Sequence, residues 1–385
     1  MRVPYVSVNV HSSGSKFSPS SFCERTQTKY EFATNVNSTR RYSGLVPSTS
    51  PRRKRATIHD VAVESGISRG TVSRVVNGER YVSEEAKALI EAAIAKVGYV
   101  PNNAARSLVM QRSQAVGFIV HEPHSLFIED PNIGNILLGA NSALSVADYQ
   151  MVCLIVDSER DMQRVARYLS GGFVDGAIIV SARHNDPIVK VVEKLQLPTT
   201  FVGHPPDQRK LPFVSIDNRA SARAITERLM ATGRTRIGMV ATALDRDSGA
   251  DRLAGFRDAL GDRFDEHLVV TVPYYSFASG LEGMRELLHR EPQLDGVFAA
   301  ADSIGVGAVE ALREAGRRVP EDVGIVGFDD SSWATRSQPA LSTVHQPATA
   351  LGERAAESIL SQLRGDEPDS NGFLLETPIV WRGSA

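Results

Sequence analysis

From residue 115 onward, short apolar runs alternate with longer segments whose apolar residues recur at helical spacing. The predicted strands are 115–120, 151–156, 176–180, 199–203, 237–241, 268–272, 296–300 and 324–328. The predicted helices between and beside them are 133–147, 161–169, 187–195, 220–231, 251–260, 279–289 and 304–315. Strands that alternate with helices form parallel sheets covered on both faces. The body of the chain is therefore predicted to be α/β, with two doubly wound parallel-sheet subdomains.

The segment 57–98 has a different pattern, which predicts three short helices. Thr57 and Asp60 have the spacing of a capping box at the start of the first helix, which Gly66 ends. Ser68 caps a second helix over 69–77, and a third helix follows Ser83 and ends at Gly98. The inward-facing residues are predicted to be Val72, Val75 and Val76 in the second helix and Leu89, Ile90, Ala93, Ile94 and Val97 in the third. Two short helices joined by a glycine-containing turn indicate an all-α helix-turn-helix unit, whose second helix enters the major groove of DNA.

The overall charge of −2 conceals an asymmetry along the chain. Residues 51–113 carry 11 Arg and Lys against 6 Asp and Glu, whereas residues 114–385 carry 26 against 37. A basic segment can neutralise phosphates and release counterions, while an acidic body is repelled by DNA. The charge distribution therefore favours double-stranded DNA as the partner of the helical segment.

Several classes of protein are disfavoured by what the sequence lacks. Cys23 and Cys153 cannot build a disulfide framework, and Cys153 lies in an apolar run typical of a core strand. The chain has no run of about 18 apolar residues and no signal-peptide core at its N-terminus. It also has no Walker loop, no nucleophile elbow and no dinucleotide fingerprint after the first strand. We therefore predict a cytoplasmic, nucleoid-associated protein with no catalytic residues and no cofactor.

Residues 1–50 are rich in Ser, Thr, Asn and Arg and have weak periodicity, which predicts disorder. One interpretation is a flexible basic tail that adds nonspecific affinity for DNA. The other is an untranslated extension, because 35 Arg against 8 Lys suggests a GC-rich genome, in which a GTG codon at Val46 could start the chain. In either case the basic arm 52–55 remains and is expected to contact phosphates or a minor groove.

The helical segment resembles the headpiece of the lactose-repressor (LacI/GalR) transcription regulators. The residues that carry the resemblance are 57–62, 66–68, 71–78, 98–102 and 104–108, and the similarity continues from about residue 56 to the C-terminus. The resemblance implies a headpiece over 51–100, a hinge helix and linker over 101–113, and an effector-binding and dimerisation domain over 114–385. That domain is expected to be similar to periplasmic sugar-binding proteins, with its ligand cleft at the carboxyl ends of the strands.

In this family the second helix of the headpiece reads bases. Its exposed candidates here are Arg69, Gly70 and Arg74, and family members place a base-reading pair at the positions of Arg69 and Gly70. Arginine can bind guanine O6 and N7 bidentately, which discriminates by roughly 1–3 kcal/mol, and Gly70 leaves room for a base methyl or the backbone. The alternative for Arg69 is a phosphate contact. The remaining predicted DNA contacts, mostly to phosphates, are Thr57, Ser68, Thr71, Ser73, Asn77 and Tyr99.

The segment 101–110 resembles the hinge helix of the family, which enters the minor groove. Its predicted DNA-contacting residues are Asn102, Ala105 and Leu108, and small residues such as Ala105 let two copies pack closely. Leu108 lies where family members insert a leucine between base steps, a known minor-groove device. The alternative for Leu108 is packing between two hinge helices.

The resemblance also implies five effector-binding residues, which are Phe127, Arg252, Tyr275, Asp302 and Asp329. Arg252 lies where relatives bind a hydroxyl or carboxylate, Asp329 follows a strand that ends at the cleft, and Tyr275 is expected to stack on the ligand. Structural alternatives are a salt bridge for Arg252, packing at the rim for Tyr275 and a helix cap for Asp330.

Two departures from the family pattern bear on the ligand. Ala301-Asp302 replaces the usual Asn-Asp, which removes an amide, and the loop 121–132, which contains Phe127, is longer than usual. The loop includes His121, Glu122 and His124, but a metal site needs fixed geometry and usually a further ligand, and no nearby Cys or His supplies one, so we predict none.

These observations predict a homodimeric repressor that a small sugar or sugar derivative releases from operator DNA. Two alternatives remain open at this point. One is a corepressor-dependent repressor that responds to a nucleobase or nucleoside. The other is a periplasmic-type ligand-binding module with an inert helical cap, which retention on DNA with a steep salt dependence would exclude.

Overall fold

The computed structural model describes residues 56–77, 82–100, 112–206, 210–367 and 372–385. Several sequence predictions lie outside these residues. They are the N-terminal extension 1–50, the basic arm 52–55, and the hinge segment with Asn102, Ala105 and Leu108.

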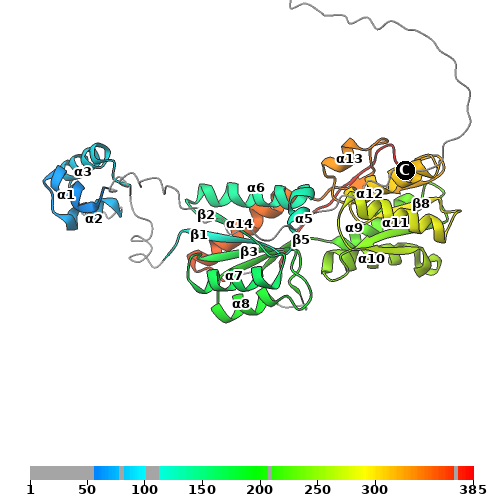
Figure 1. The fold of residues 1–385 in the computed structure, drawn as a ribbon, viewed down its shortest axis with the longest axis horizontal. Coiled ribbons are helices and arrows are strands. Elements are labelled where there is room, and N and C mark those ends of the chain that lie inside the picture. The colour runs from blue at the N-terminus through cyan, green and yellow to red at the C-terminus, as the bar shows by residue number, and fades with distance from the viewer. Residues whose placement is uncertain (1–55, 78–81, 101–111, 207–209, 368–371) are drawn as a thin grey trace, which may run out of the picture. The chain divides into compact units, whose positions relative to one another are not determined.

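The N-terminal helices are α1 (Ile58–Ser65), α2 (Arg69–Val76) and α3 (Glu84–Val97), drawn in blue in Figure 1. The capping box is present, because the Asp60 backbone N–H donates to Thr57 Oγ1 and the Thr57 backbone N–H donates to the Asp60 carboxylate at 2.7 Å. Gly66 and Gly98 end α1 and α3 with φ of 70° and 65°, values that glycine adopts without strain. The predicted helix boundaries and caps are confirmed.

A small core holds the three helices together. Its buried residues are Val61, Ala62, Val72, Ile90 and Ala93. Val75, Val76, Ile94 and Val97 pack at its edge, as predicted. Leu89 was assigned to the same stripe but is 55% exposed, so that assignment is wrong. Leu89 precedes Ile90 by one residue, and a step of 100° along the helix takes it out of the stripe.

The body of the chain begins with a subdomain built on a six-stranded parallel sheet (Figure 1). The strand order is β11 (Phe373–Leu375), β5 (Phe213–Ile216), β4 (Thr199–Val202), β3 (Gly176–Val180), β1 (Ala115–Val120) and β2 (Gln150–Ile155). Its helices are α5 (His124–Glu129), α6 (Pro131–Val146), α7 (Glu159–Ser170), α8 (Pro187–Leu195) and α14 (Ala348–Arg364).

The two faces of this sheet contribute to two separate cores. Val116 and Phe118 pack toward α6 and α14, while Ala115 and Ile119 pack toward α7 and α8. This alternation follows from the two-residue period of a strand, and it explains why β1 is apolar throughout.

The second subdomain has a four-stranded parallel sheet in the order β7 (Val269–Val272), β6 (Ile237–Thr242), β8 (Gly296–Ala299) and β9 (Gly324–Val326). Its helices are α9 (Asn218–Met230), α10 (Asp247–Leu260), α11 (Phe277–Arg290), α12 (Asp302–Glu314) and α13 (Ser332–Arg336), with 3₁₀ turns η2 (Gly261–Arg263) and η3 (Glu266–Leu268). An antiparallel pair, β10 (Thr343–Val344) and β12 (Ile379–Val380), completes it.

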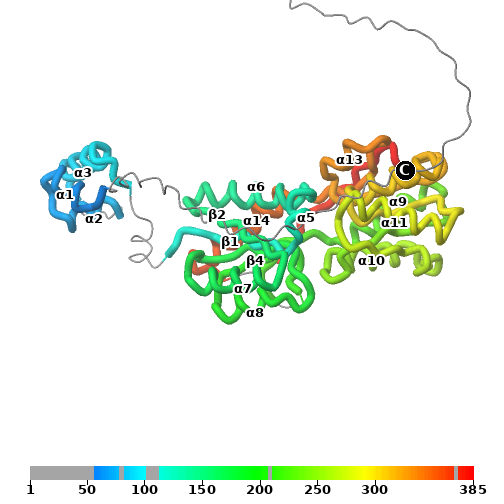
Figure 2. Tube along the Cα trace, viewed as in Figure 1, coloured from blue at the N-terminus to red at the C-terminus, as the bar shows by residue number. Residues whose placement is uncertain are grey.

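The chain passes three times between the two subdomains, as the tube in Figure 2 shows. It leaves the first subdomain after β5, returns after β10 to form α14, and leaves again between β11 and β12. Both subdomains are thus discontinuous in sequence. The cleft between them is bordered by the carboxyl ends of strands from both sheets.

Helices α6 and α14 approach each other closely, and two glycines make this possible. A Cβ added to Gly139 would lie 2.0 Å from the Thr349 carbonyl oxygen, and one added to Gly352 would lie 2.0 Å from the Ile136 carbonyl oxygen. Only glycine fits at either position, so this helix pair depends on both.

The two parallel-sheet halves predicted from the sequence are confirmed, and the predicted strands and helices agree with the structure to within a few residues. Cys153, expected in the core, is instead exposed on the edge strand β2. Apolar neighbours in sequence do not reveal that a strand lies at a sheet edge with one face uncovered. Within the described residues, no helix is both long and apolar enough to cross a membrane.

Candidate functional site

The amino-terminal half of α2 presents the predicted base-reading residues to solvent. Arg69, Gly70 and Arg74 are all exposed, and Gly70 and Arg74 lie four residues apart on one face of the helix. A Cβ at Gly70 would find nothing closer than Ser68 Oγ at 3.9 Å. Packing within the headpiece therefore does not require this glycine, and the free space faces outward.

Most of the predicted phosphate-contacting residues also hold the helix ends in place. Thr57 Oγ1 donates to Asp60 Oδ2 at 2.8 Å, and the Thr71 backbone N–H donates to Ser68 Oγ at 3.2 Å. Asn77 Nδ2 donates to Ser73 Oγ at 3.4 Å, and Tyr99 packs against the headpiece core. Polar groups that are held in place at helix ends suit a surface that contacts the phosphate backbone of DNA and fixes its position.

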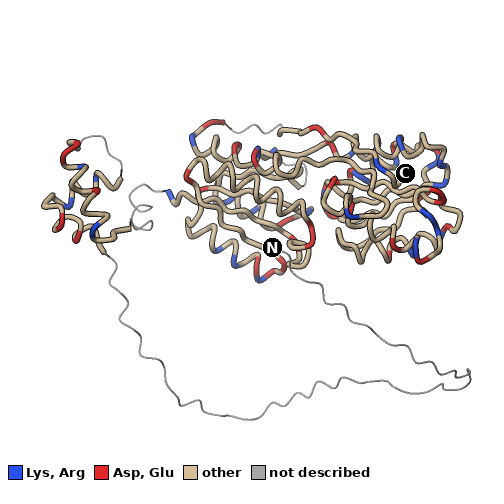
Figure 3. The backbone as a smooth tube through the Cα atoms, turned by 90° about the horizontal axis from the view of Figure 1, so that it is seen from above, with Lys and Arg blue, Asp and Glu red and all other residues tan. Residues whose placement is uncertain are grey.

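The charge of the headpiece lies mostly beyond its helices. The described residues 56–77 and 82–100 contain four Lys and Arg and five Asp and Glu, and Figure 3 shows both signs interspersed along them. The excess of basic residues counted over 51–113 comes from the flanking segments. Arg69 and Arg74, the two arginines of α2, are exposed among these mixed charges.

A cavity lies between the two subdomains. Its volume of about 110 Å³ is several times the volume that one water molecule needs. Its walls come from the carboxyl ends of β3, β4 and β5, from residues that follow β1, β6, β7, β9 and β10, and from helices α6, α10 and α14. The polar and charged lining residues are Glu122, Asp130, Asn132, Ser181, Ser215, Asn218, Arg246, Ser248, Arg252, Tyr275, Asp329 and Gln346. The apolar lining residues are Ile133, Ile136, Val180, Val202, Ile216 and Leu351. The cleft at the carboxyl ends of the strands therefore contains a small cavity with both polar and apolar walls.

Arg252 lines the cavity and is only 4% exposed. Its Nε donates to Asn218 Oδ1 at 2.9 Å and its Nη1 to the Ala300 carbonyl oxygen at 2.7 Å. Its Nη2 lies 3.4 Å from Asp329 Oδ1 and donates to Gln346 Oε1, and the guanidinium stacks on the Phe328 ring. Most of the five N–H donors of the Arg252 guanidinium are therefore already bonded to the protein. Arg252 both borders the cavity and connects the residues of its wall.

Asp329 directly follows the strand end and has φ of 111°, an unusual conformation for a residue with a side chain. It is 8% exposed, and burial raises the pKa of its carboxyl well above the ordinary value, although Arg252 opposes this shift. Asp130, at the N-terminus of α6, also has a pKa raised by burial, to about 6. Two carboxyl groups of weakened acidity therefore border the cavity, where they can donate or accept hydrogen bonds.

Tyr275 contributes the one aromatic ring among the described residues that line the cavity. Its hydroxyl lies 3.4 Å from Ser248 Oγ, and burial raises its pKa, so the phenol stays neutral near physiological pH. Arg252, Tyr275 and Asp329 are thus brought together as the sequence predicted.

Asp302 and Phe127 do not line the cavity. The Asp302 side chain is completely buried, accepts from the Ser331 backbone N–H at 2.7 Å and from Thr343 Oγ1 at 2.6 Å, and has a pKa raised by burial to about 7. Its carboxylate ties α12 to the segment after β9, which leaves the expected ligand contact of this residue without support. Phe127 is half-buried against the apolar core, which leaves its expected contact without support.

The long loop 121–132 shapes the cavity through its two ends. Glu122 follows β1, while Asp130 and Asn132 begin α6; α5 lies between them. His121 pairs with Asp186 and His124 with Asp157, each through Nδ1 at 2.6 Å. The two rings therefore serve different carboxylates, and the described residues contain no group of three or more potential metal ligands.

Several lining residues were not predicted from the sequence, mainly Asn132, Asn218, Arg246 and Gln346. Asn218 follows β5, a strand that was not predicted, and Arg246 follows β6 in the turn before α10. Residues that line a ligand cleft in this kind of fold tend to follow the carboxyl ends of the parallel strands, so polar residues at those positions would have been the candidates to consider. Gln346 could not be found that way, because it enters at a chain crossover.

Two family models match the chain. The model described as bacterial regulatory proteins, lacI family, matches residues 57–102, and the periplasmic binding protein-like domain matches residues 226–385.

Curated relatives match over most of the chain. The HTH-type transcriptional regulator CelR of Thermobifida fusca is 38% identical over 338 residues, which cover 86% of this chain and 99% of the relative. The regulator RegA of Clostridium saccharobutylicum is 32% identical over 334 residues, covering 85% and 98%. Among solved structures, a CelR-cellobiose complex has a TM-score of 0.69 at 36% identity, covering 86% of this chain and 100% of the other. A lac repressor dimer bound to operator has a TM-score of 0.76 at 25% identity, covering 86% and 99%.

Proposed function

Because the chain belongs to the lactose-repressor (LacI) family of transcription regulators, we propose that it is a repressor whose hold on operator DNA is controlled by a neutral saccharide. The observation that carries the proposal is the pairing of two surfaces in one chain. One is the exposed Arg69 and Gly70 face of α2, and the other is the cavity lined by Arg252, Tyr275 and Asp329. The first suits base edges, and the second suits a small molecule rich in hydroxyl groups.

DNA readout is proposed to depend on Arg69. Replacement of Arg69 by Ala should relax the preference at one or two base pairs per half-site, at a cost of roughly 1–3 kcal/mol for the preferred base. Replacement of Arg52 by Ala, in the flanking basic arm, should weaken binding to all sequences about equally and lower the salt dependence. If the specificity ratio of the Arg69 variant were unchanged, Arg69 would be a phosphate contact.

Gly70 offers a sharper test, because the headpiece itself leaves room for a side chain at this position. An alanine there should stabilise α2 by up to about 1 kcal/mol through helix propensity. We nevertheless expect weaker operator binding, since the methyl group would occupy the space proposed for a base or the DNA backbone. Thermal unfolding and DNA titration of the same variant separate the two effects. Tighter binding that follows the gain in stability would contradict the proposal.

The functional unit is proposed to be a homodimer that reads a dyad-symmetric site of roughly 14–20 base pairs, with two headpieces on two half-sites. The hinge residues Asn102, Ala105 and Leu108 are proposed to contact the centre of that site. Footprinting should show dyad symmetry, and replacement of Leu108 by Ala should reduce both affinity and bending. A footprint without symmetry would refute the dimeric readout.

For the effector, the cavity favours a sugar over a nucleobase. The residues lining it offer both donors and acceptors, and Tyr275 supplies a single flat face on which the C–H face of a pyranose can pack. A nucleobase would favour aromatic contacts on both of its faces. Cellobiose is the first candidate, because the CelR structure similar to this chain is a cellobiose complex.

A thermal-shift screen of cellobiose, glucose and nucleosides tests this assignment. Replacement of Tyr275 by Ala should abolish the shift caused by a saccharide. Tyr274 is the matched control, because it is 47% exposed and does not line the cavity, so its replacement by Ala should leave the shift intact. A nucleoside shift without any saccharide shift would instead favour the corepressor alternative.

The direction of control is proposed to be release. A ligand can shift an equilibrium only by its preference for one state, and a coupling of 1–3 kcal/mol corresponds to about 5–150-fold weaker operator binding. If the saccharide tightened operator binding, the chain would be a corepressor-dependent regulator.

A further inference from the structure

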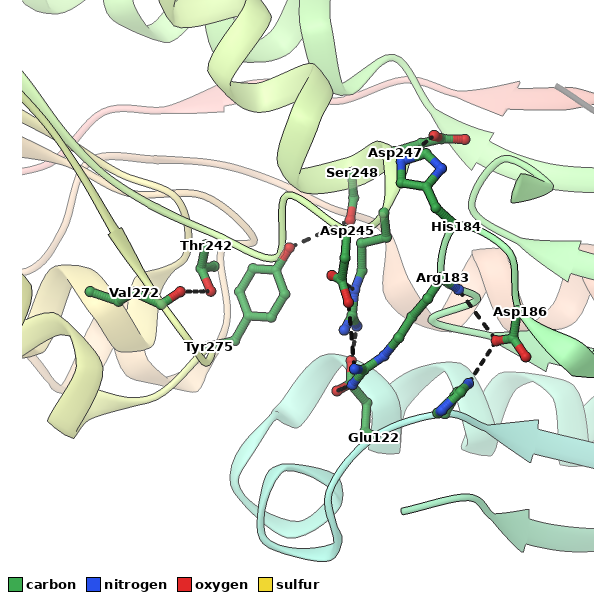
Figure 4. A network of polar contacts seen from close by, with 12 residues as sticks. Glu122, Arg183, His184, Asp186, Thr242, Asp245, Asp247, Ser248, Val272 and Tyr275 are labelled. Atoms are coloured by element: carbon green, nitrogen blue, oxygen red, sulfur yellow. Dashed lines mark hydrogen bonds and ion pairs between the residues drawn. The ribbon is translucent and has the colours of Figure 1, made fainter. Parts of the chain in front are cut away.

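Four charged side chains form a closed ring at one end of the cavity. Glu122 accepts from Arg246 Nη1, and Arg246 Nε donates to Asp245 Oδ1 at 3.2 Å. Asp245 Oδ2 lies 3.4 Å from Arg183 Nη1, and Arg183 Nη2 lies 3.5 Å from Glu122 Oε2. The signs alternate around the ring, so every charge has two neighbours of opposite sign. Figure 4 shows Glu122, Arg183 and Asp245 converging at this point.

The ring joins the two subdomains. Glu122 follows β1 and Arg183 follows β3, both in the first subdomain, whereas Asp245 and Arg246 immediately precede α10 in the second. Two of the four ion pairs, Glu122–Arg246 and Arg183–Asp245, therefore cross the cleft. A backbone bond from the His184 N–H to the Asp245 carbonyl oxygen, at 2.8 Å, crosses beside them. All three contacts exist only while the subdomains are held together.

The inner and outer halves of the ring have different surroundings. Glu122 and Arg246 are 3% and 8% exposed and line the cavity. The Arg183 and Asp245 side chains are 34% and 47% exposed and do not line it. The inner pair is thus available to a ligand, while the outer pair is open to solvent and salt.

We propose that the ring is a clasp across the cleft, and that Arg183 and Asp245 tune effector affinity from outside the cavity. The part that concerns effector affinity rests on the proposed function, in which the cleft binds an effector. Separating the subdomains would break both ion pairs that cross the cleft and leave each of the four charges with one partner instead of two, which disfavours opening. The outer pair positions the inner pair, because each of its members also contacts one member of the inner pair.

The clasp is tested first without any effector, through the distance between the subdomains. Spin labels at Lys194, exposed in α8, and Asp262, exposed in η2, report cleft opening in a full-length chain with Cys23 and Cys153 replaced by Ala. Replacement of Asp245 by Asn, or of Arg183 by Gln, should increase the population of long distances. The control is replacement of Glu314 by Gln, which breaks an exposed ion pair with Arg285 inside one subdomain and should change nothing. Identical distance distributions for the clasp variants and the original chain would overturn the proposal.

The second test measures cellobiose affinity by calorimetry. Each outer-pair variant should bind about two- to fivefold more weakly, and the double variant should be little worse than either single one, because both break the same contact. Binding of this uncharged ligand should also weaken between about 0.1 M and 1 M salt, and the salt effect should disappear in the variants.

The outcomes separate the clasp from the proposed function. If the original chain binds no saccharide, the effector assignment fails while the distance measurement still tests the clasp. If the chain binds cellobiose but the two replacements are additive and the salt effect persists in the variants, the clasp is refuted and the effector assignment stands.

Discussion

The headpiece and the cleft use charged side chains in opposite ways. In the headpiece, the arginines proposed to read DNA are exposed on a helix held by five buried apolar residues and by its caps. In the cleft, Arg252, Arg246 and Glu122 are buried, and their charges are paired with one another and with neighbouring groups. Base reading and stability are therefore separable in the headpiece, whereas in the cleft the same side chains provide both ligand contacts and stability.

This difference follows from what each surface binds. DNA is larger than the headpiece and meets it from outside, so the reading residues need only a rigid support. A small effector must be enclosed, so its polar partners are desolvated and have to satisfy each other across the cleft.

Replacement of Arg252 by Ala should destabilise the body by about 3–5 kcal/mol, because it removes the buried donor of three hydrogen bonds and leaves the acceptor oxygens of Asn218, Ala300 and Gln346 without it. Urea unfolding followed by tryptophan fluorescence measures this directly, since both tryptophans, Trp333 and Trp381, lie in the second subdomain. Arg257, exposed in the same helix, is the control, and its replacement by Ala should cost less than about 1 kcal/mol. If both replacements lowered the free energy of unfolding equally, the buried arginine of the cleft would contribute no more to stability than an exposed one, which would contradict the contrast.

Replacement of Gly352 by Ala should destabilise the α6–α14 contact by about 1–3 kcal/mol or more, because the added methyl group meets the Ile136 carbonyl. Gly134 in α6 is the matched control: a Cβ there meets nothing within 4 Å, so alanine should stabilise the helix by up to about 1 kcal/mol. Headpiece binding to nonspecific DNA should be unaffected by either change. The two replacements should change the free energy of unfolding in opposite directions. A Gly352 variant as stable as the original chain would contradict the proposed close packing of α6 and α14.

The raised pKa of Asp130 predicts a pH dependence of stability. Below about pH 4 the group is protonated in both the folded and unfolded chain, and between pH 4 and its folded pKa of about 6 only the folded chain keeps the proton. Its contribution therefore falls as pH rises through this window, by about 1–2 kcal/mol after allowance for partial exposure.

Replacement of Asp130 by Asn tests that window. Asparagine also caps helices, so the start of α6 is preserved while the titration is lost. The variant should gain stability relative to the original chain between pH 4 and pH 7, measured by the unfolding midpoint. A constant difference across this range would show that Asp130 titrates normally.

The smallest expected effect is in the headpiece. Replacement of Thr57 by Ala removes the capping box and should cost about 1 kcal/mol of headpiece stability. DNA affinity should fall modestly, and cellobiose binding and the urea unfolding of the body should not change. An altered saccharide affinity would show that the two regions are not separable in the way proposed.

The same contrast explains what the sequence could predict. The headpiece motifs are local: caps, glycine stops and apolar spacing all lie within a few residues of Thr57, Ser68 and Gly98, so three helices were placed correctly. The cavity is assembled from residues as distant as Glu122 and Gln346, which only the tertiary fold brings together. Arg252, Tyr275 and Asp329 were found through family resemblance, while Glu122 was weighed only as a metal ligand and Arg246 was missed.

Two differences between expectation and structure have the same physical origin. Asp302 follows a strand end, as a ligand contact would, but its carboxylate accepts hydrogen bonds from the Ser331 backbone N–H and Thr343 Oγ1. Helix α14 was not predicted, because its buried residues include three alanines and a glycine, which give a weak hydrophobic signal. In both cases the decisive partner lies far away in the sequence.

The central claim is that occupancy of the cavity controls the grip of the headpiece on DNA. The most direct measurement is the affinity of the full-length chain for a dyad-symmetric duplex selected from random DNA, with and without saturating cellobiose, at constant salt. The account predicts that affinity falls by about 5–150-fold with the sugar, and that the fall is lost when Tyr275, but not Tyr274, is replaced by Ala. An affinity for the selected duplex that does not respond to cellobiose or to any other saccharide would contradict it.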